Sequence, residues 1–145
     1  MSRRTSIIKA LAERLKDING SAPYNTNLYS AAFPYLKFWD EVSNFPCVYM
    51  SPGSEMREYH PAGFKWGYLA VSLKLYTRGD DAVDQLEKLL EDVERVIDAN
   101  NQLVYDVANS YETTEILIQS ITTDEGLLAP FGVGEVNLQV RYAIM

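Results

Sequence analysis

The sequence predicts one α+β domain spanning residues 1–145, with an antiparallel or mixed β-sheet of about four to five strands, two main helices packed on one face, and a protruding β-hairpin. Two segments carry apolar residues at spacings of three and four, as amphipathic helices do. Other segments alternate apolar and polar residues between turn signals, as strands do. Several of these strands follow one another without an intervening helix, an order typical of α+β folds.

The first helix is predicted near the N-terminus. Thr5 or Ser2 is its expected N-cap, and Asn19 with Gly20 is its expected stop. The apolar residues that follow the helical repeat are Ile7, Ile8, Leu11, Leu15 and Ile18.

Residues 21–44 lose this periodicity and are rich in aromatic side chains. Pro23 and Pro34 interrupt the segment, which predicts irregular structure with one short strand near residues 27–30. Two interpretations stay open for residues 24–44. They form a loop packed over the core, or they form a contact surface for a neighbouring molecule, since aromatic side chains are enriched at interfaces.

A long β-hairpin is predicted in the middle of the chain. Strand signals cover residues 46–51, a turn is expected at 52–54, a second limb covers 55–60, and another turn follows at 60–63. Residues 64–77 then alternate cleanly. At about 3.3 Å per residue these fourteen residues span ~45 Å. We expect so long a strand to outrun its sheet and to pair there with residues 55–60 as a protruding hairpin.

The second half adds a helix and two strands. The helix is predicted at residues 81–97 with Asp80 or Asp81 as its cap, and the strands at 113–123 and 134–145. The loop at 126–134 between these strands has an apolar tip. The apolar stripe of the helix comprises Val83, Leu86, Leu90, Val93 and Ile97, and its polar face comprises Glu87, Lys88, Glu91, Asp92 and Arg95.

Composition limits the function classes. With 145 residues and 47% hydrophobic content, the chain can bury one core. Thirteen basic against twenty acidic side chains give a net charge of −7, which argues against sequence-independent DNA binding. Cys47 is the single cysteine, so an intrachain disulfide is excluded. No apolar run approaches the ~20 residues of a membrane-spanning helix, and we expect no membrane association.

The residues that could carry chemistry have plainer explanations. His60 lies in a predicted turn and has no second histidine with which to share a metal. Cys47 is expected to be a small buried apolar side chain within a strand. Asp80, Asp81 and Asp84 favour the positive end of a helix dipole over a cation site.

Two further motifs are equally plain. The glycines at 132 and 134 lack the third glycine of a phosphate loop and precede a strand, which indicates a turn. The basic residues near the N-terminus form a solvated helix face or touch an acidic neighbour; they are Arg3, Arg4, Lys9, Arg14 and Lys16. We therefore expect no enzyme activity, no cofactor and no metal site.

Several of these motifs, taken in order, resemble a known family. They are Phe-Pro-Cys-Val-Tyr-Met at 45–50, the charged limb at 54–59, the aromatic entry to the long strand at 66–75, the acidic helix opened by Asp80 and Asp81, Ile-Gln-Ser-Ile-Thr at 118–122, and a final Val-x-Leu-x-Val-x-Tyr strand. Together they resemble the tail terminator proteins of long-tailed bacteriophages, the lambda-type minor tail protein. Residues 24–44 depart from that pattern because they contain more aromatic side chains.

The resemblance implies a virion structural protein that forms a homohexameric ring. Such a ring binds the tail tube protein, stops tube polymerisation and forms the interface to the head–tail connector protein. It lies at the head-proximal end of the tail, is assembled in the host cell cytoplasm, and lets DNA pass without specific binding. The acidic net charge suits such a pore, because carboxylates repel phosphates. Two alternatives stay open: a head–tail connector or other neck adaptor ring protein, and a small α+β ligand-binding domain or enzyme.

Two exposed segments are the expected contact surfaces, namely the hairpin over residues 55–65 and the apolar loop tip. Long unpaired strand edges and apolar groups at a turn both favour burial against a neighbour. The candidate residues for contacts with other subunits or with the tail tube are Glu55, Arg57, Glu58, Tyr59, His60, Phe64, Lys65, Leu127, Leu128 and Phe131.

Overall fold

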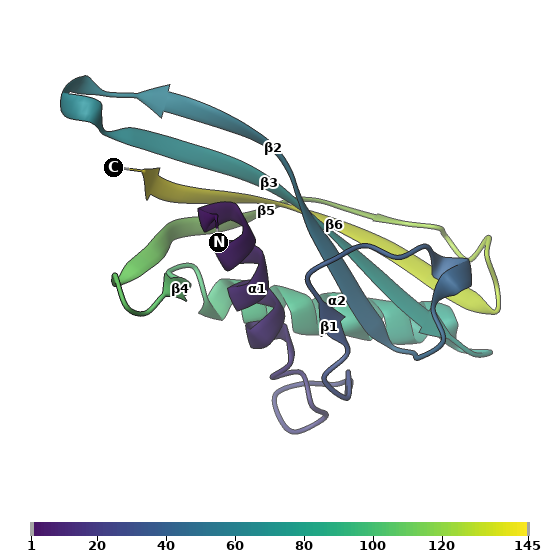
Figure 1. The fold of residues 1–145 in the computed structure, drawn as a ribbon. Helices are drawn as coiled ribbons and strands as arrows, with labels where there is room; N and C mark the ends of the chain where they lie inside the picture. The colour runs from purple at the N-terminus through teal and green to yellow at the C-terminus, as the bar shows by residue number, and fades with distance from the viewer. Residues whose placement is uncertain (1, 145) are drawn as a thin grey trace.

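The computed structural model describes residues 2–144 and shows a twisted six-stranded sheet with two α-helices on one side (Figure 1). The strand order is β1-β2-β3-β6-β5-β4, with β1 parallel to β2 and the other neighbours antiparallel. The elements are α1 (Arg3–Leu15), β1 (Ala32–Phe33), η1 (Trp39–Glu41), β2 (Cys47–Tyr59), η2 (Pro61–Gly63), β3 (Lys65–Arg78), α2 (Ala82–Ala99), β4 (Val104–Asp106), β5 (Tyr111–Thr123) and β6 (Phe131–Ile144).

The α+β class and the mixed sheet are confirmed, but the expected number of strands was too low. The two additional strands, β1 and β4, have only two and three residues. So short a strand shows no alternation that a sequence pattern could reveal. The strand expected near residues 27–30 is also wrong, because Tyr29 and Ser30 adopt φ values of 50° and 63° in the left-handed region.

The connection between the limbs of the hairpin also differs from the prediction. Residues 52–54 do not form a turn, because β2 runs on through them and absorbs them in a β-bulge between Pro52 and Glu55. Pro52 has no N–H for a ladder, which suits a bulge on an edge strand. The strand β3 does not outrun its sheet, since β6 pairs with it from Lys65 opposite Ile144 to Arg78 opposite Phe131.

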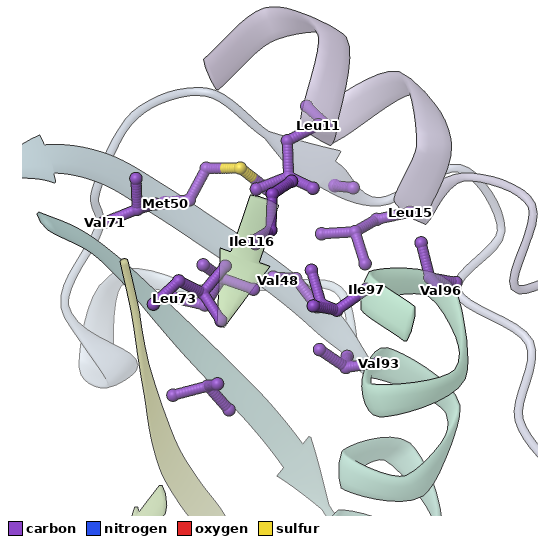
Figure 2. Packing of buried hydrophobic residues seen from close by; sticks show 14 of the residues in the cluster. Leu11, Leu15, Val48, Met50, Val71, Leu73, Val93, Val96, Ile97 and Ile116 are labelled. Carbon is purple, nitrogen blue, oxygen red and sulfur yellow. The ribbon is translucent and has the colours of Figure 1, made fainter. Parts of the chain in front are cut away.

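The main core lies between the helices and one face of the sheet. Figure 2 shows Leu11 and Leu15 of α1 and Val93, Val96 and Ile97 of α2 meeting side chains from β2, β3 and β5. Each such apolar side chain contributes about 1.5–3 kcal/mol when it is fully buried. Within the predicted stripe of α2 only Val83 is exposed, because it lies in the first turn beside the loop between β5 and β6. Ser2 is the N-cap of α1.

Asp92 was expected on the polar face of α2 and is instead fully buried. Its carboxylate accepts hydrogen bonds from the backbone N–H groups of Asn25 and Thr26, at 2.8–3.0 Å, and from the Thr26 hydroxyl at 2.5 Å. These bonds satisfy the charged group and attach the loop after α1 to the middle of α2.

The other face of the sheet, turned away from α1 and α2, is called here the open face. At one end it is covered by the aromatic segment, because Phe33, Trp39 and Phe45 pack on a small cluster that includes Tyr49 and Tyr76. The first interpretation of residues 24–44, a loop packed over the core, holds for these side chains. From Ser72 towards η2 the open face carries no covering element within residues 2–144 (Figure 1).

Candidate assembly surface

The hairpin end of the molecule divides the predicted contact residues between two faces. Glu55 and Arg57 lie on the side of the helices, and the side chain of Glu55 is only 5% exposed. Its carboxylate accepts a hydrogen bond from the Tyr142 hydroxyl at 2.5 Å and one from Arg57 Nε at 2.7 Å. Burial, followed by this bond to Glu55, raises the pKa of Tyr142 well above its ordinary value. Glu55 therefore holds the hairpin together.

Glu58 lies on the open face and is exposed. It accepts a hydrogen bond from the Tyr68 hydroxyl at 3.1 Å and pairs with His60 Nε2 at 2.7 Å. The bond to His60, followed by the bond from Tyr68, holds the pKa of Glu58 below its ordinary value. At this end Tyr59 is 71% exposed and Met56 is 75% exposed. Sequence reasoning did not single out Met56.

An aromatic stack supports the tip of the hairpin. The ring of Phe64 meets Trp66 edge-on at 5.1 Å, and the Arg141 guanidinium lies 4.0 Å from the centre of the Trp66 ring. Lys65 Nζ lies 5.5 Å from the ring of Tyr59. Cation–π contacts of this kind stabilise a pair by about 0.5–2 kcal/mol. Sequence reasoning missed Trp66 and Arg141, whose contact depends on the pairing of β3 with β6.

The loop tip between β5 and β6 lies at the opposite end of the strands (Figure 1). Leu127 is 84% exposed, whereas Leu128 and Phe131 are half-buried. Phe131 packs on Trp39 and Phe45, with ring centres 5.1 and 5.7 Å away. Of the three apolar residues predicted at the tip, Leu127 alone projects fully into water.

The aromatic segment adds exposed apolar side chains near this end. Leu36 and Phe38 border a surface groove of about 240 Å³ whose base includes Tyr76. The Tyr76 hydroxyl donates to the carbonyl of Lys37 at 2.6 Å, and burial raises the pKa of Tyr76 to about 12. The second interpretation, a contact surface, therefore stays a prediction for the exposed part of the segment.

Two strand edges are free in the part of the chain that the structure describes. The strand β1 pairs only with Val48 and Tyr49, so β2 has no outer neighbour over residues 54–59. The strand β4 pairs only with the start of β5, and the side chain of Asn101 accepts from the N–H of Ile116, so residues 117–123 have no outer neighbour. Such edges are templates for pairing with another chain.

The candidates for chemistry have structural roles. Burial raises the pKa of the Cys47 thiol to about 12, which leaves almost no reactive thiolate at neutral pH. Asp81 accepts a hydrogen bond from Gln85, and Asp84 pairs with Lys88 at 3.1 Å. Within residues 2–144 no three His, Cys, Asp or Glu side chains are grouped to hold a metal ion. No helix in the same range is long and apolar enough to cross a membrane.

Comparisons with known proteins agree with one another. A family model described as "Bacteriophage Tail Tube Terminator Protein" matches residues 1–145. The chain is 38% identical over 152 residues to the tail tube terminator protein p142 of Escherichia phage T5, covering 98% of this chain and 94% of that protein. Among solved structures, a chain from the virion of a native gene transfer agent particle shares the fold, with a TM-score of 0.57, 11% identity and coverage of 99% and 100%. The chain belongs to the family of bacteriophage tail tube terminator proteins, which are structural proteins of the virion tail.

Proposed function

We propose that six copies of this chain form a ring that caps the tail tube. The ring stops polymerisation of the tube protein and forms the interface to the head–tail connector protein at the head-proximal end. DNA passes through the ring without specific binding. Family membership supports the capping role, and the two free strand edges support the ring.

The edges carry the argument for ring closure. In the order β2-β3-β6-β5 every neighbour is antiparallel, so β2 and β5 run in opposite directions. When copies are related by rotation about an axis along the strands, β5 of one copy meets β2 of the next as an antiparallel pair. This contact joins two different surfaces, and such contacts close into rings when the rotation fits. Each junction removes two free edges.

A ring of this kind has two different ends. The strands run between the hairpin end, with Met56 and Tyr59, and the end formed by η1 and the tip at Leu127 (Figure 1). Because the strands run along the ring axis, these ends lie on opposite rims. Each rim carries exposed apolar side chains, which suits binding to the tail tube on one rim and to the connector on the other.

Electron microscopy of purified tail tubes mixed with the chain tests the proposal. We expect six-fold rings at one end of each tube and an arrest of further tube growth. Sedimentation of the free protein shows whether the ring forms before it meets the tube. Monomers or dimers both in solution and on tubes would refute the ring. Rings that bind the portal but leave tubes uncapped would indicate a connector instead.

Replacing Met56 and Tyr59 together with serine is expected to impair capping while the free energy of unfolding changes by no more than about 0.5 kcal/mol, because both side chains are exposed. Arg57→Glu is the contrasting variant. It places a second carboxylate beside Glu55, and we expect a loss of about 1–3 kcal/mol. Urea denaturation and tube-capping assays measure both effects. A serine variant that unfolds readily but caps normally when folded would assign these residues to the scaffold.

Leu127→Ser is expected to weaken assembly without changing the melting temperature, because the side chain is 84% exposed in the subunit. Val107→Ser is a matched control, since Val107 is also 84% exposed but lies in the turn between β4 and β5. The yield of capped tubes in electron micrographs compares the two variants. Equal losses for both would show that the tip has no special role.

A further inference from the structure

We propose that the open face lines the pore of the ring, so that passing duplex DNA meets hydroxyl and amide groups with almost no free charge, while the acidic residues of α2 lie outside. This inference rests on the proposed ring. It replaces the expectation that an acidic pore repels the DNA, because the position of the charges now enters the argument.

The centre of the open face is a row of small polar side chains. The sheet register aligns Ser51, Ser72, Asn137 and Ser120 across four strands. Asn137 Nδ2 donates to Ser120 Oγ at 3.0 Å, and Ser72 Oγ lies 3.3 Å from Asn137 Oδ1. The next row towards η2 includes Ala70 opposite Gln139. These groups bind one another and water without offering a fixed charge.

The charged groups on the open face are held by partners. Lys74 Nζ lies 2.5 Å from Glu135, and this hydrogen bond holds the pKa of Glu135 below its ordinary value. Arg141 lies over Trp66 and opposite Glu115 in the register. The helix α2 differs, because it carries six carboxylates and two basic side chains, a net charge of −4, on the other side of the sheet.

Ring dimensions decide which face turns inward. At about 4.8 Å per strand, four strands from each of six subunits form a circle of about 115 Å, or about 150 Å with a strand tilt of about 40°. The backbones then stand about 37–48 Å apart across the ring. The side chains of the open face take about 5 Å from each side and leave roughly 27–38 Å. An inward helix layer takes about 15 Å from each side and leaves roughly 7–18 Å. Duplex DNA, about 20 Å across, passes only with the open face inside.

The chemistry of this face fits passage. Unpaired lysines in the pore would hold phosphates and release counterions, which creates tight, salt-dependent binding. Unpaired carboxylates would raise the energy of a polyanion in a narrow channel. A neutral face of hydroxyl and amide groups avoids both effects, and DNA slides past exchangeable contacts.

The test places lysines on the open face. Gln139→Lys with Ser120→Lys adds two positive charges per subunit, and Glu91→Gln with Glu94→Gln makes the same change of charge on the exposed face of α2. Rings are isolated as hexamers, or locked by an engineered disulfide between subunits, and titrated with a short linear duplex at low salt. We expect no micromolar binding by the unmodified ring or by the α2 variant. We expect at least hundredfold tighter binding by the lysine variant, which weakens steeply with salt.

Closed circular DNA supplies the decisive comparison, because it cannot enter the pore of a preformed ring. The lysine ring is expected to bind the linear duplex and not the circle. Equal binding of circles, tighter binding by the α2 variant, or no binding by an intact lysine ring would overturn the inference. Circular dichroism checks folding, and Gln139→Lys alone replaces the double variant if that variant does not fold. The absence of any ring would instead refute the proposed function.

Discussion

Replacing Asp92 with alanine is expected to lower the free energy of unfolding by about 3 kcal/mol. The carboxylate is fully buried and accepts hydrogen bonds from two backbone N–H groups and one hydroxyl. Its removal leaves the N–H groups of Asn25 and Thr26 without their partner, and a charged acceptor bonded to backbone amides contributes more than a neutral one. For a chain of 145 residues the melting temperature should fall by about 6–12 °C, measured by calorimetry.

Asp98→Ala is the control for this prediction. Asp98 lies on the same helix and loses the same charge, but it is exposed. We expect its free energy of unfolding to change by no more than about 0.5 kcal/mol. Asp92→Asn keeps the shape of the side chain but turns one acceptor oxygen into an N–H₂ group facing donors, so it should also destabilise. Equal effects of Asp92→Ala and Asp98→Ala would show that the hydrogen bonds to the loop contribute little.

The role of Asp92 could not be predicted from the sequence. In α2 it occupies a position next to Glu91, within a run of charged residues that resembles a solvated helix face. What buries it is the loop at residues 25–26, which is 66 residues earlier in the chain, counted from Thr26. A periodic pattern reports which side of a helix is apolar but not which backbone amides approach it.

The long elements were predictable because each buries one face over many residues. The alternation of β3 and the spacing of three and four in α2 repeat often enough to exclude the other period. The bulge at Pro52 was not predictable, because proline and glycine indicate a turn and a bulge equally well. The bulge decides which side chains of β2 point to the helices, and this explains why Glu55, predicted at an interface, is buried against Tyr142.

The candidate assembly surface shows the same limit. The sequence indicated two exposed segments, the hairpin and the loop tip, from their charges and apolar residues. It did not indicate the free edges of β2 and β5 or the polar row on the open face, since both depend on the strand order β2-β3-β6-β5. Strand order is set by contacts between distant segments, such as β3 with β6, that no local pattern records.

Cysteines on the two free edges are expected to join neighbouring subunits into covalent rings. Ser54→Cys or Met56→Cys on β2 is combined with Leu117→Cys, Gln119→Cys or Ile121→Cys on β5. Directly opposed residues on adjacent strands have Cα atoms about 4.5–5.5 Å apart, within the range that a disulfide accepts. The native Cys47 does not interfere, because its thiol is buried and its pKa is raised to about 12.

The pattern of products distinguishes a closed ring from other assemblies. After mild oxidation, the correct register should give a ladder that ends at six subunits on a non-reducing gel, and pairs in other registers should give little product. Variants with a cysteine on β2 alone should remain uncrosslinked, because a heterologous junction never places β2 beside a second β2. A single-edge variant that forms dimers efficiently would instead indicate a two-fold contact between like edges. A ladder that continues beyond six would mean that the same β2–β5 junction builds an open filament. The end of the ladder thus tests closure, and the cysteine pair that crosslinks identifies the register in which the subunits complete each other's sheets.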